Sequence, residues 1–135
     1  MKRAIIGALA LVLMAGVAWT QDRAAQIQTV IQSQFDAFEV DDFATAFTFA
    51  SPMIQQMFQT PERFGQMVQQ GYPMVHRPRS VEFSDVTERG GRMFQDVLVT
   101  DRAGTMHLLE YEMLESDDGW EINGVRFKKP VAIGA

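Results

Sequence analysis

Residues 72–99 read YPMVHRPRSVEFSDVTERGGRMFQDVLV, and the spacing of apolar side chains changes within this stretch. Upstream of Tyr72, apolar side chains recur at steps of three and four, which is the period of an amphipathic helix. From Ser80 onward they recur at every second position, which is the period of a half-buried strand. The pattern predicts an α+β protein, with helices first and an antiparallel sheet after them.

Downstream of this change, turn residues divide the chain into about four strands. Gly90-Gly91 is typical of a hairpin turn. Val86 is out of phase with Phe83, which predicts a β-bulge near residues 84–85. Further turns are predicted at residues 101–104 and 117–119, and Asn123-Gly124 indicates a second bulge or kink. Strands bent in this way are expected to form a curved sheet, a cone with one open end.

Upstream, the sequence predicts three or four helices, most of them introduced by a capping residue. The longest of these predicted helices covers residues 22–40. It is predicted because Ile27, Ile31, Phe35 and Phe38 fall on one side at helical spacing. The shorter helices start with side-chain oxygens that can accept backbone N–H groups. These caps are Asp41 or Asp42, Ser51 before Pro52, and Thr60 before Pro61.

The amino terminus predicts export. Lys2 and Arg3 precede an uninterrupted apolar run over residues 4–17, and residues 16–18 (Gly-Val-Ala) place small side chains where a signal peptidase reads. The run is shorter than the roughly 20 residues that a membrane-spanning helix needs. We therefore expect residues 1–18 to be a cleaved bacterial signal peptide and the mature protein to be periplasmic or secreted. An uncleaved anchor is the alternative.

The rest of the chain is long enough for one domain, predicted over residues 22–128, with a flexible tail over residues 129–135. The full chain carries 12 basic and 17 acidic residues, and removal of Lys2 and Arg3 with the signal leaves 10 against 17, a net charge of −7. Such a charge disfavours nucleic acid and anionic lipid as partners. With no cysteine and two histidines, the sequence predicts no metal site and no cofactor.

Three strings carry a family resemblance: FASPMIQQMF at residues 49–58, TPERFGQMVQQGYPMVHRPRSVEF at residues 60–83, and DDGWEINGV at residues 117–125. They are similar to an uncharacterised bacterial family, domain of unknown function 4864, over roughly residues 26–127. The order of elements resembles the nuclear transport factor 2-like superfamily, the α+β cone. The resemblance implies helices packed on a curved sheet. It implies no single activity, because that superfamily holds isomerases, dehydratases and non-enzymatic modules, which often form homodimers.

The connection between helices and sheet carries the catalytic candidate. Pro73 and Pro78 predict an extended, non-helical connection, and His76 lies between them. The resemblance implies that an enzyme of this fold class would use a polar pair in the cone, often Asp with His or Tyr, and Asp42 is the candidate acid for His76. His107 shares a strand face with apolar residues and is expected to be a core or rim histidine that hydrogen-bonds a neighbour.

Two arginines in the same connection are candidates for binding an anionic ligand. Arg77 and Arg79 flank Pro78, and paired guanidinium groups suit carboxylate or phosphate. The alternative is structural, with one arginine tying the connection to an acid such as Glu62 or Asp41.

Glu110 and Glu112 share a strand face with Leu108 and Leu114. They are surface acids if that face meets solvent, and acid–base candidates if it lines the cone. A partner that covers part of this face is the third possibility.

A non-enzymatic module that binds a small apolar or amphipathic molecule, or a protein partner through its sheet, is the leading hypothesis. The alternative is an isomerase-like or dehydratase-like enzyme that uses His76 with an acid in the cone. Six aromatic residues are predicted for the pocket or an interface: Phe47, Tyr72, Phe83, Phe94, Tyr111 and Trp120.

Overall fold

The computed structural model describes the backbone of residues 6–129 and the side chains of residues 21–129. The predicted signal peptide lies outside the residues whose side chains are described, and the predicted tail lies outside the described residues from position 130 on. In the part of the chain that is described, no helix has both the length and the apolar character needed to cross a membrane.

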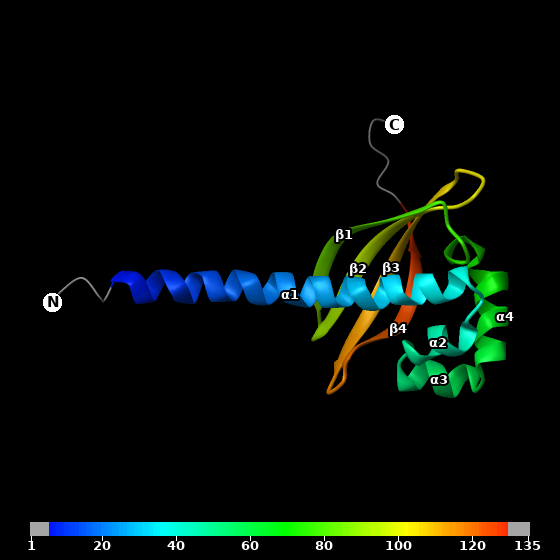
Figure 1. Ribbon diagram of the computed structural model, residues 1–135, viewed down its shortest axis with the longest axis horizontal. Helices are drawn as coiled ribbons and strands as arrows, with labels where there is room; N and C mark the ends of the chain where they lie inside the picture. The colour runs from blue at the N-terminus through cyan, green and yellow to red at the C-terminus, as the bar shows by residue number, and fades with distance from the viewer. Residues whose placement is uncertain (1–5, 130–135) are drawn as a thin grey trace.

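Four α-helices form the first half of the domain (Figure 1). The predicted helix over residues 22–40 is the second part of α1 (Ile6–Glu39), and its apolar side faces the core. The others are α2 (Phe43–Thr48), α3 (Pro52–Phe58) and α4 (Pro61–Gly71). The predicted caps are confirmed, because the side chains of Asp42, Ser51 and Thr60 each accept a backbone N–H three residues later.

A short 3₁₀-helix, η1 (Pro73–Val75), connects the helices to the sheet. The prediction of an extended connection was wrong here, because Pro73 occupies the first position of the turn, where its missing N–H costs nothing. The backbone is extended at His76. Met74 and Val75 are buried by this turn, which anchors the connection to the core.

The second half of the chain is one antiparallel sheet in the order β1-β2-β3-β4, so the predicted α+β class is confirmed. Its strands are β1 (Ser80–Arg89), β2 (Arg92–Thr100), β3 (Met106–Ser116) and β4 (Gly119–Lys128). Helix α1 lies along one face of the sheet, and α2, α3 and α4 gather near one end of it (Figure 1).

Both predicted irregularities are present, and a buried side chain supports the first. The pairing of β1 with β2 shifts between Phe83 and Val86. Gln95, which is fully buried, donates its amide N–H groups to the carbonyls of Ser84, Asp85 and Asp96. The amide of Gln95 therefore satisfies backbone groups that the bulge leaves without sheet partners.

The second irregularity joins the short helices to the sheet. The pairing of β3 with β4 shifts at Glu112 and Met113, leaving Asn123 as the extra residue. Asn123 is buried, accepts a hydrogen bond of 2.7 Å from the Ser51 hydroxyl and donates one to Glu112. The Ser51 N–H also donates to the Ile122 carbonyl at 2.8 Å. These bonds hold the start of α3 against β4 and so position one side of the site described next.

Candidate functional site

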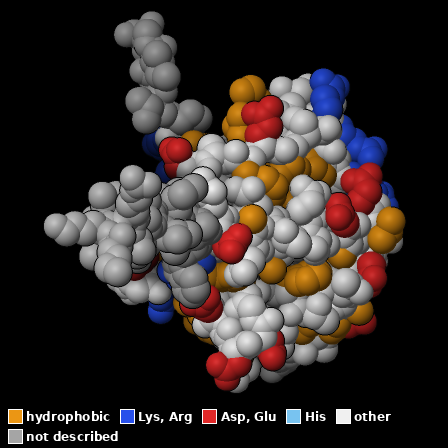
Figure 2. Space-filling view, turned by 60° about the vertical axis from the view of Figure 1, so that its left-hand side comes forward, with side chains coloured by type: hydrophobic (Ala, Val, Ile, Leu, Met, Phe, Trp, Pro, Cys, Tyr) orange, Lys and Arg blue, Asp and Glu red, His pale blue; other side chains and the backbone are white. Residues whose placement is uncertain are grey.

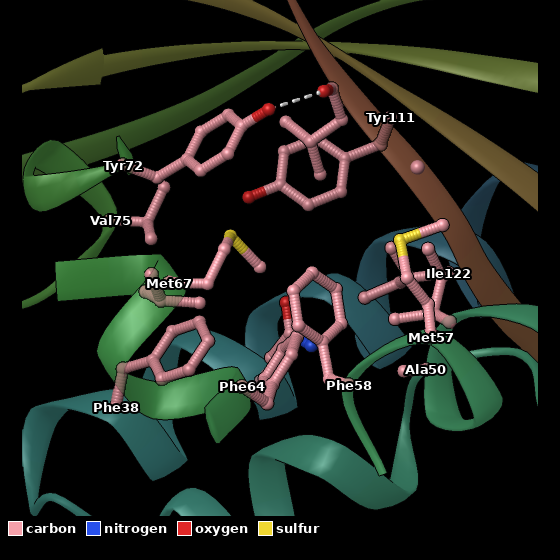
Figure 3. Close-up of a pocket in the computed structure, with 15 residues that line it drawn as sticks. Phe38, Ala50, Met57, Phe58, Phe64, Met67, Tyr72, Val75, Tyr111 and Ile122 are labelled. Atoms are coloured by element: carbon pink, nitrogen blue, oxygen red, sulfur yellow. Dashed lines mark hydrogen bonds between the residues drawn. The ribbon is translucent and has the colours of Figure 1, made fainter. Parts of the chain in front are cut away.

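An apolar cavity of about 250 Å³ lies between α3, α4 and the sheet (Figure 3). An apolar cavity of about 150 Å³ is large enough to hold benzene. The volume here therefore suits a small ring or a short chain. The wall consists of Gln34, Phe38, Ala50, Ile54, Met57, Phe58, Phe64, Met67, Val68, Tyr72, Val75, Tyr111, Ile122, Gly124 and Val125.

Aromatic rings pack around Phe64 and make the wall rigid. The Phe64 ring centroid lies 6.1 Å from that of Phe38, 6.0 Å from that of Phe58 and 5.2 Å from that of Phe47. Phe64 is buried on α4, where Gly65 lets α2 approach closely, since a Cβ at that position would lie 2.9 Å from the Phe43 ring. The cavity therefore rests on a packed aromatic core.

The cavity opens beside the two short helices. The Met57 side chain of α3 is 62% exposed, and Ile54 and Met67 are half-buried. Deeper in the wall, Phe38, Val68 and Tyr111 are buried. The entrance is thus bordered by flexible side chains, since methionine adapts its shape readily.

Two tyrosine hydroxyls belong to this wall, and they differ in their hydrogen bonds. The Tyr72 hydroxyl donates to the Val125 carbonyl at 3.0 Å, and its ring stacks on Phe127. The Tyr111 hydroxyl points into the space between Tyr72 and Met67 (Figure 3). Among the residues that the structure describes, none forms a hydrogen bond with it.

The Tyr111 hydroxyl stays protonated. The Tyr111 side chain is 1% exposed, and burial raises the pKa of its hydroxyl well above the usual range, with a smaller contribution from nearby Tyr72. Gln34 is the other polar side chain in the wall. It is buried, and its amide N–H donates to the Ala46 carbonyl at 3.1 Å. The described residues of the wall are therefore uncharged, and the Tyr111 hydroxyl is a neutral donor among them.

The predicted aromatic residues are divided between this cavity and other places. Tyr72 and Tyr111 line it, and Phe47 stands behind Phe64. Phe83 borders a shallow hollow beside the polar side of α1. Periodicity correctly placed most of these rings on apolar faces, but it does not show which faces meet around a cavity.

Phe94 and Trp120 pack against arginines instead. The Arg89 guanidinium lies 3.8 Å from the Phe94 ring centroid, and the Arg23 guanidinium 5.3 Å from that of Trp120. The Trp120 indole N–H donates to the Gln26 side chain at 3.1 Å.

Several wall residues were not among the predicted site residues, most clearly Phe58, Met67 and Ile122. Their apolar spacing was visible in the sequence. Their convergence depends on the docking of α3 and α4 against β4, which no local pattern reports.

His76 lies outside this cavity, on a separate polar groove of about 320 Å³. Its Nε2 atom lies 2.6 Å from a carboxylate oxygen of Asp41, not of Asp42, so the predicted pairing was wrong. The reason is local, because Asp42 caps α2 through the Thr45 N–H. Asp41 instead takes a left-handed backbone conformation, with φ of 58°, in the turn after α1.

The two predicted anion-binding arginines both contact the protein itself. Arg77 donates to the other Asp41 carboxylate oxygen at 2.6 Å and to the Glu39 carbonyl at 2.9 Å. Arg79 donates to the Arg102 carbonyl at 3.0 Å. Arg77 therefore ties the connection to the end of α1, which is the structural alternative that the sequence suggested.

The groove also contains the second histidine. The His107 Nε2 atom lies 2.9 Å from a carboxylate oxygen of Asp101, as the sequence predicted for a histidine bonded to a neighbour. Hydrogen bonding to His76 lowers the pKa of Asp41, helped by Arg77, and hydrogen bonding to His107 lowers the pKa of Asp101. In the described part of the chain, no three His, Asp or Glu side chains are placed to hold a metal ion.

The sheet face opposite α1 carries Glu110 and Glu112, so they do not line the cavity. Glu110 is 3% exposed because arginine side chains cover it. Burial acts to raise its pKa, but hydrogen bonds from Arg126 and Arg89 outweigh burial and the net direction is down. Glu110 is therefore a buried carboxylate with ion-pair partners, and neither the surface acid nor the proton donor that the sequence left open.

On the face shown in Figure 2, acidic side chains are scattered over the surface and do not gather in one patch. The apolar cavity is the feature of the described molecule that offers most space to a ligand without a charged wall.

The chain belongs to the family described as "Domain of unknown function (DUF4864)", whose sequence profile matches residues 20–133, so the predicted membership is confirmed. A search of curated proteins found no match. Among solved structures, the chain is similar to an NTF-2 like protein of unknown function from Burkholderia xenovorans LB400. The identity is 13%, the match covers 83% of this chain and 91% of that chain, and the TM-score is 0.49.

Proposed function

We propose that this protein is an exported, non-enzymatic domain that binds a small, largely apolar molecule in the cavity between α3, α4 and the sheet. The observation that carries the proposal is the cavity itself, about 250 Å³ of space with an almost wholly apolar wall. Native cores are close-packed and contain few voids larger than a water molecule. Small molecules bind in concave, mostly apolar pockets, and this one lies just below the roughly 300–1,000 Å³ of drug-sized ligand sites, as suits a smaller ligand.

The distribution of polar residues supports binding over catalysis. A general base must reach a substrate proton within about 3 Å. The described wall of the cavity contains no histidine and no carboxylate, and His76 is engaged with Asp41 elsewhere. Export is supported by the sequence alone, through Lys2, Arg3 and the apolar run that follows.

Native mass spectrometry of the protein purified after export tests both parts. We expect a polypeptide mass that begins at Trp19, together with an added small-molecule mass that is lost on denaturation. A mass that begins at Met1 would contradict cleavage. A bare dimer would instead indicate an interaction module that uses the sheet.

A substitution that fills the cavity tests the site, with a substitution of similar volume at the same position as the control. Met67→Trp places an indole ring in the space, whereas Met67→Leu keeps a similar volume. With isopropylbenzene as the probe in calorimetric titration, we expect Met67→Trp to weaken binding by about tenfold or more and Met67→Leu to have little effect. Equal affinities for Met67→Trp and the original protein would place the probe elsewhere and contradict the proposal.

A further inference from the structure

We infer that the molecule bound in this cavity is uncharged and carries an oxygen that accepts a hydrogen bond from the Tyr111 hydroxyl. The inference rests on the proposed function and specifies the class of ligand, such as a ketone, ester or alcohol on an apolar body. It follows from three observations: the unpartnered hydroxyl, the bonded hydroxyl of Tyr72, and the absence of charge in the described wall.

The Tyr111 hydroxyl lies in the cavity wall and gains no partner from the described residues. The side chain is 1% exposed, and among the described residues none accepts or donates a hydrogen bond to its oxygen. Most polar groups inside a protein are paired, so a donor that faces a cavity without a protein partner is available to a molecule that enters it. The hydroxyl points between Tyr72 and Met67 (Figure 3), which both line the cavity, and a ligand atom there would be within its reach.

Tyr72 is the internal comparison for this inference. It lines the same cavity, but its hydroxyl donates to the Val125 carbonyl at 3.0 Å, so its single proton is already used. The two phenols thus have separate roles. Tyr72 joins η1 to β4, and Tyr111 keeps a donor for the cavity.

The described wall also determines the charge of the ligand. None of its described members is Lys, Arg, His, Asp or Glu, so a carboxylate or an ammonium group would lose hydration without a countercharge. A neutral carbonyl or hydroxyl oxygen loses less, and the Tyr111 donor replaces the lost water. A phenol is already protonated at neutral pH, and burial raises the pKa of the Tyr111 hydroxyl further, so it remains a donor.

Two probes with the same number of heavy atoms separate the polar contact from apolar binding. Acetophenone and isopropylbenzene differ by a carbonyl oxygen in place of a methyl group. Binding of each is measured by titration calorimetry to the full chain, to Tyr111→Phe and to Tyr72→Phe. We expect Tyr111→Phe to weaken acetophenone binding by about tenfold and leave isopropylbenzene unchanged, and Tyr72→Phe to leave the ratio of the two affinities unchanged.

The outcomes distinguish this inference from the proposal on which it rests. If both probes bind and Tyr111→Phe affects them equally or not at all, the hydroxyl contact is wrong and the apolar site stands. If neither probe binds the unmodified protein, both ideas fail. Thermal unfolding is the second readout: Tyr111→Phe should unfold at the same or a higher temperature, and a clear loss would mean that the hydroxyl has a structural partner.

Discussion

The apolar cavity and the polar groove share the η1 turn, yet they use their polar groups in opposite ways. Val75 lines the cavity, whereas its neighbours Met74 and His76 line the groove. In the groove, both histidines contact aspartates. In the cavity, the Tyr111 hydroxyl has no partner among the described residues. The comparison teaches that histidines, although common in catalytic sites, can serve to hold the fold together. A wall of mostly apolar side chains can still offer a hydrogen-bond donor to a ligand.

The largest effect is expected from removing the aromatic centre of the cavity wall. Phe64→Ala deletes contacts with Phe38, Phe47 and Phe58. It should lower the free energy of unfolding by about 3–5 kcal/mol, measured by urea denaturation. Phe94→Ala, on the opposite face of the sheet, is the control and should cost less. Equal losses would mean that the wall contributes no more to the core than the outer face does.

A smaller loss of stability is expected from replacing Gln95, the side chain that supports the bulge in β1. Gln95→Leu keeps the volume but leaves the carbonyls of Ser84 and Asp85 without their amide donor. We expect a loss of about 1–3 kcal/mol in the free energy of unfolding, because buried backbone groups become unsatisfied. Faster hydrogen exchange should be confined to the amides around the bulge. Unchanged stability would show that the Gln95 amide is not needed there.

The contribution of the Asp41 contacts to stability is tested by replacing Asp41 and varying the pH. Hydrogen bonding to His76 and Arg77 lowers the pKa of Asp41. These contacts therefore stabilise the fold fully above about pH 3.8, the ordinary pKa, and the stabilisation is lost as the pH falls from there through the lowered pKa of the folded state. Asp41→Asn tolerates the left-handed backbone but cannot carry the charge. Urea midpoints should therefore differ between the two proteins at neutral pH, and the difference should shrink as the pH is lowered below 3.8. A constant difference would exclude the charge as its cause.

The smallest effect is expected from the histidine that the sequence singled out. His76→Ala should leave the affinity for isopropylbenzene unchanged, because His76 does not line the cavity. Calorimetric titration of both proteins measures this. Weakened binding would show that the polar groove affects ligand binding in the apolar cavity. An enzymatic turnover that His76→Ala abolishes would support the isomerase-like or dehydratase-like alternative.

Much of the fold was predictable because it rests on local chemistry. Ser51 and Thr60 cap helices through N–H groups three residues away, and Gly90-Gly91 supplies the two positive φ angles of a hairpin. The bulge after Phe83 was visible as a break in alternation. Such features depend on neighbours within a few residues, so the sequence contains them directly.

The candidate site was predicted only in part. Tyr72 and Tyr111 were named among six aromatic residues, and nothing local separates them from Phe94 or Trp120. The choice of Asp41 over Asp42 as the partner of His76 spans 35 positions in the chain. Pairings over that distance follow from the packing of whole elements, which periodicity does not describe.

Local patterns were sufficient for the order of helices and strands, for the caps, turns and bulges, and for membership in the family. Only the packed molecule shows that Glu110 is enclosed by arginines and that α3 and α4 leave a space against β4. It also shows that the Tyr111 hydroxyl faces this space with no hydrogen-bond partner among the described residues. The physical reason is that burial and hydrogen-bond satisfaction depend on every element that surrounds a side chain, whereas capping and periodicity depend on one.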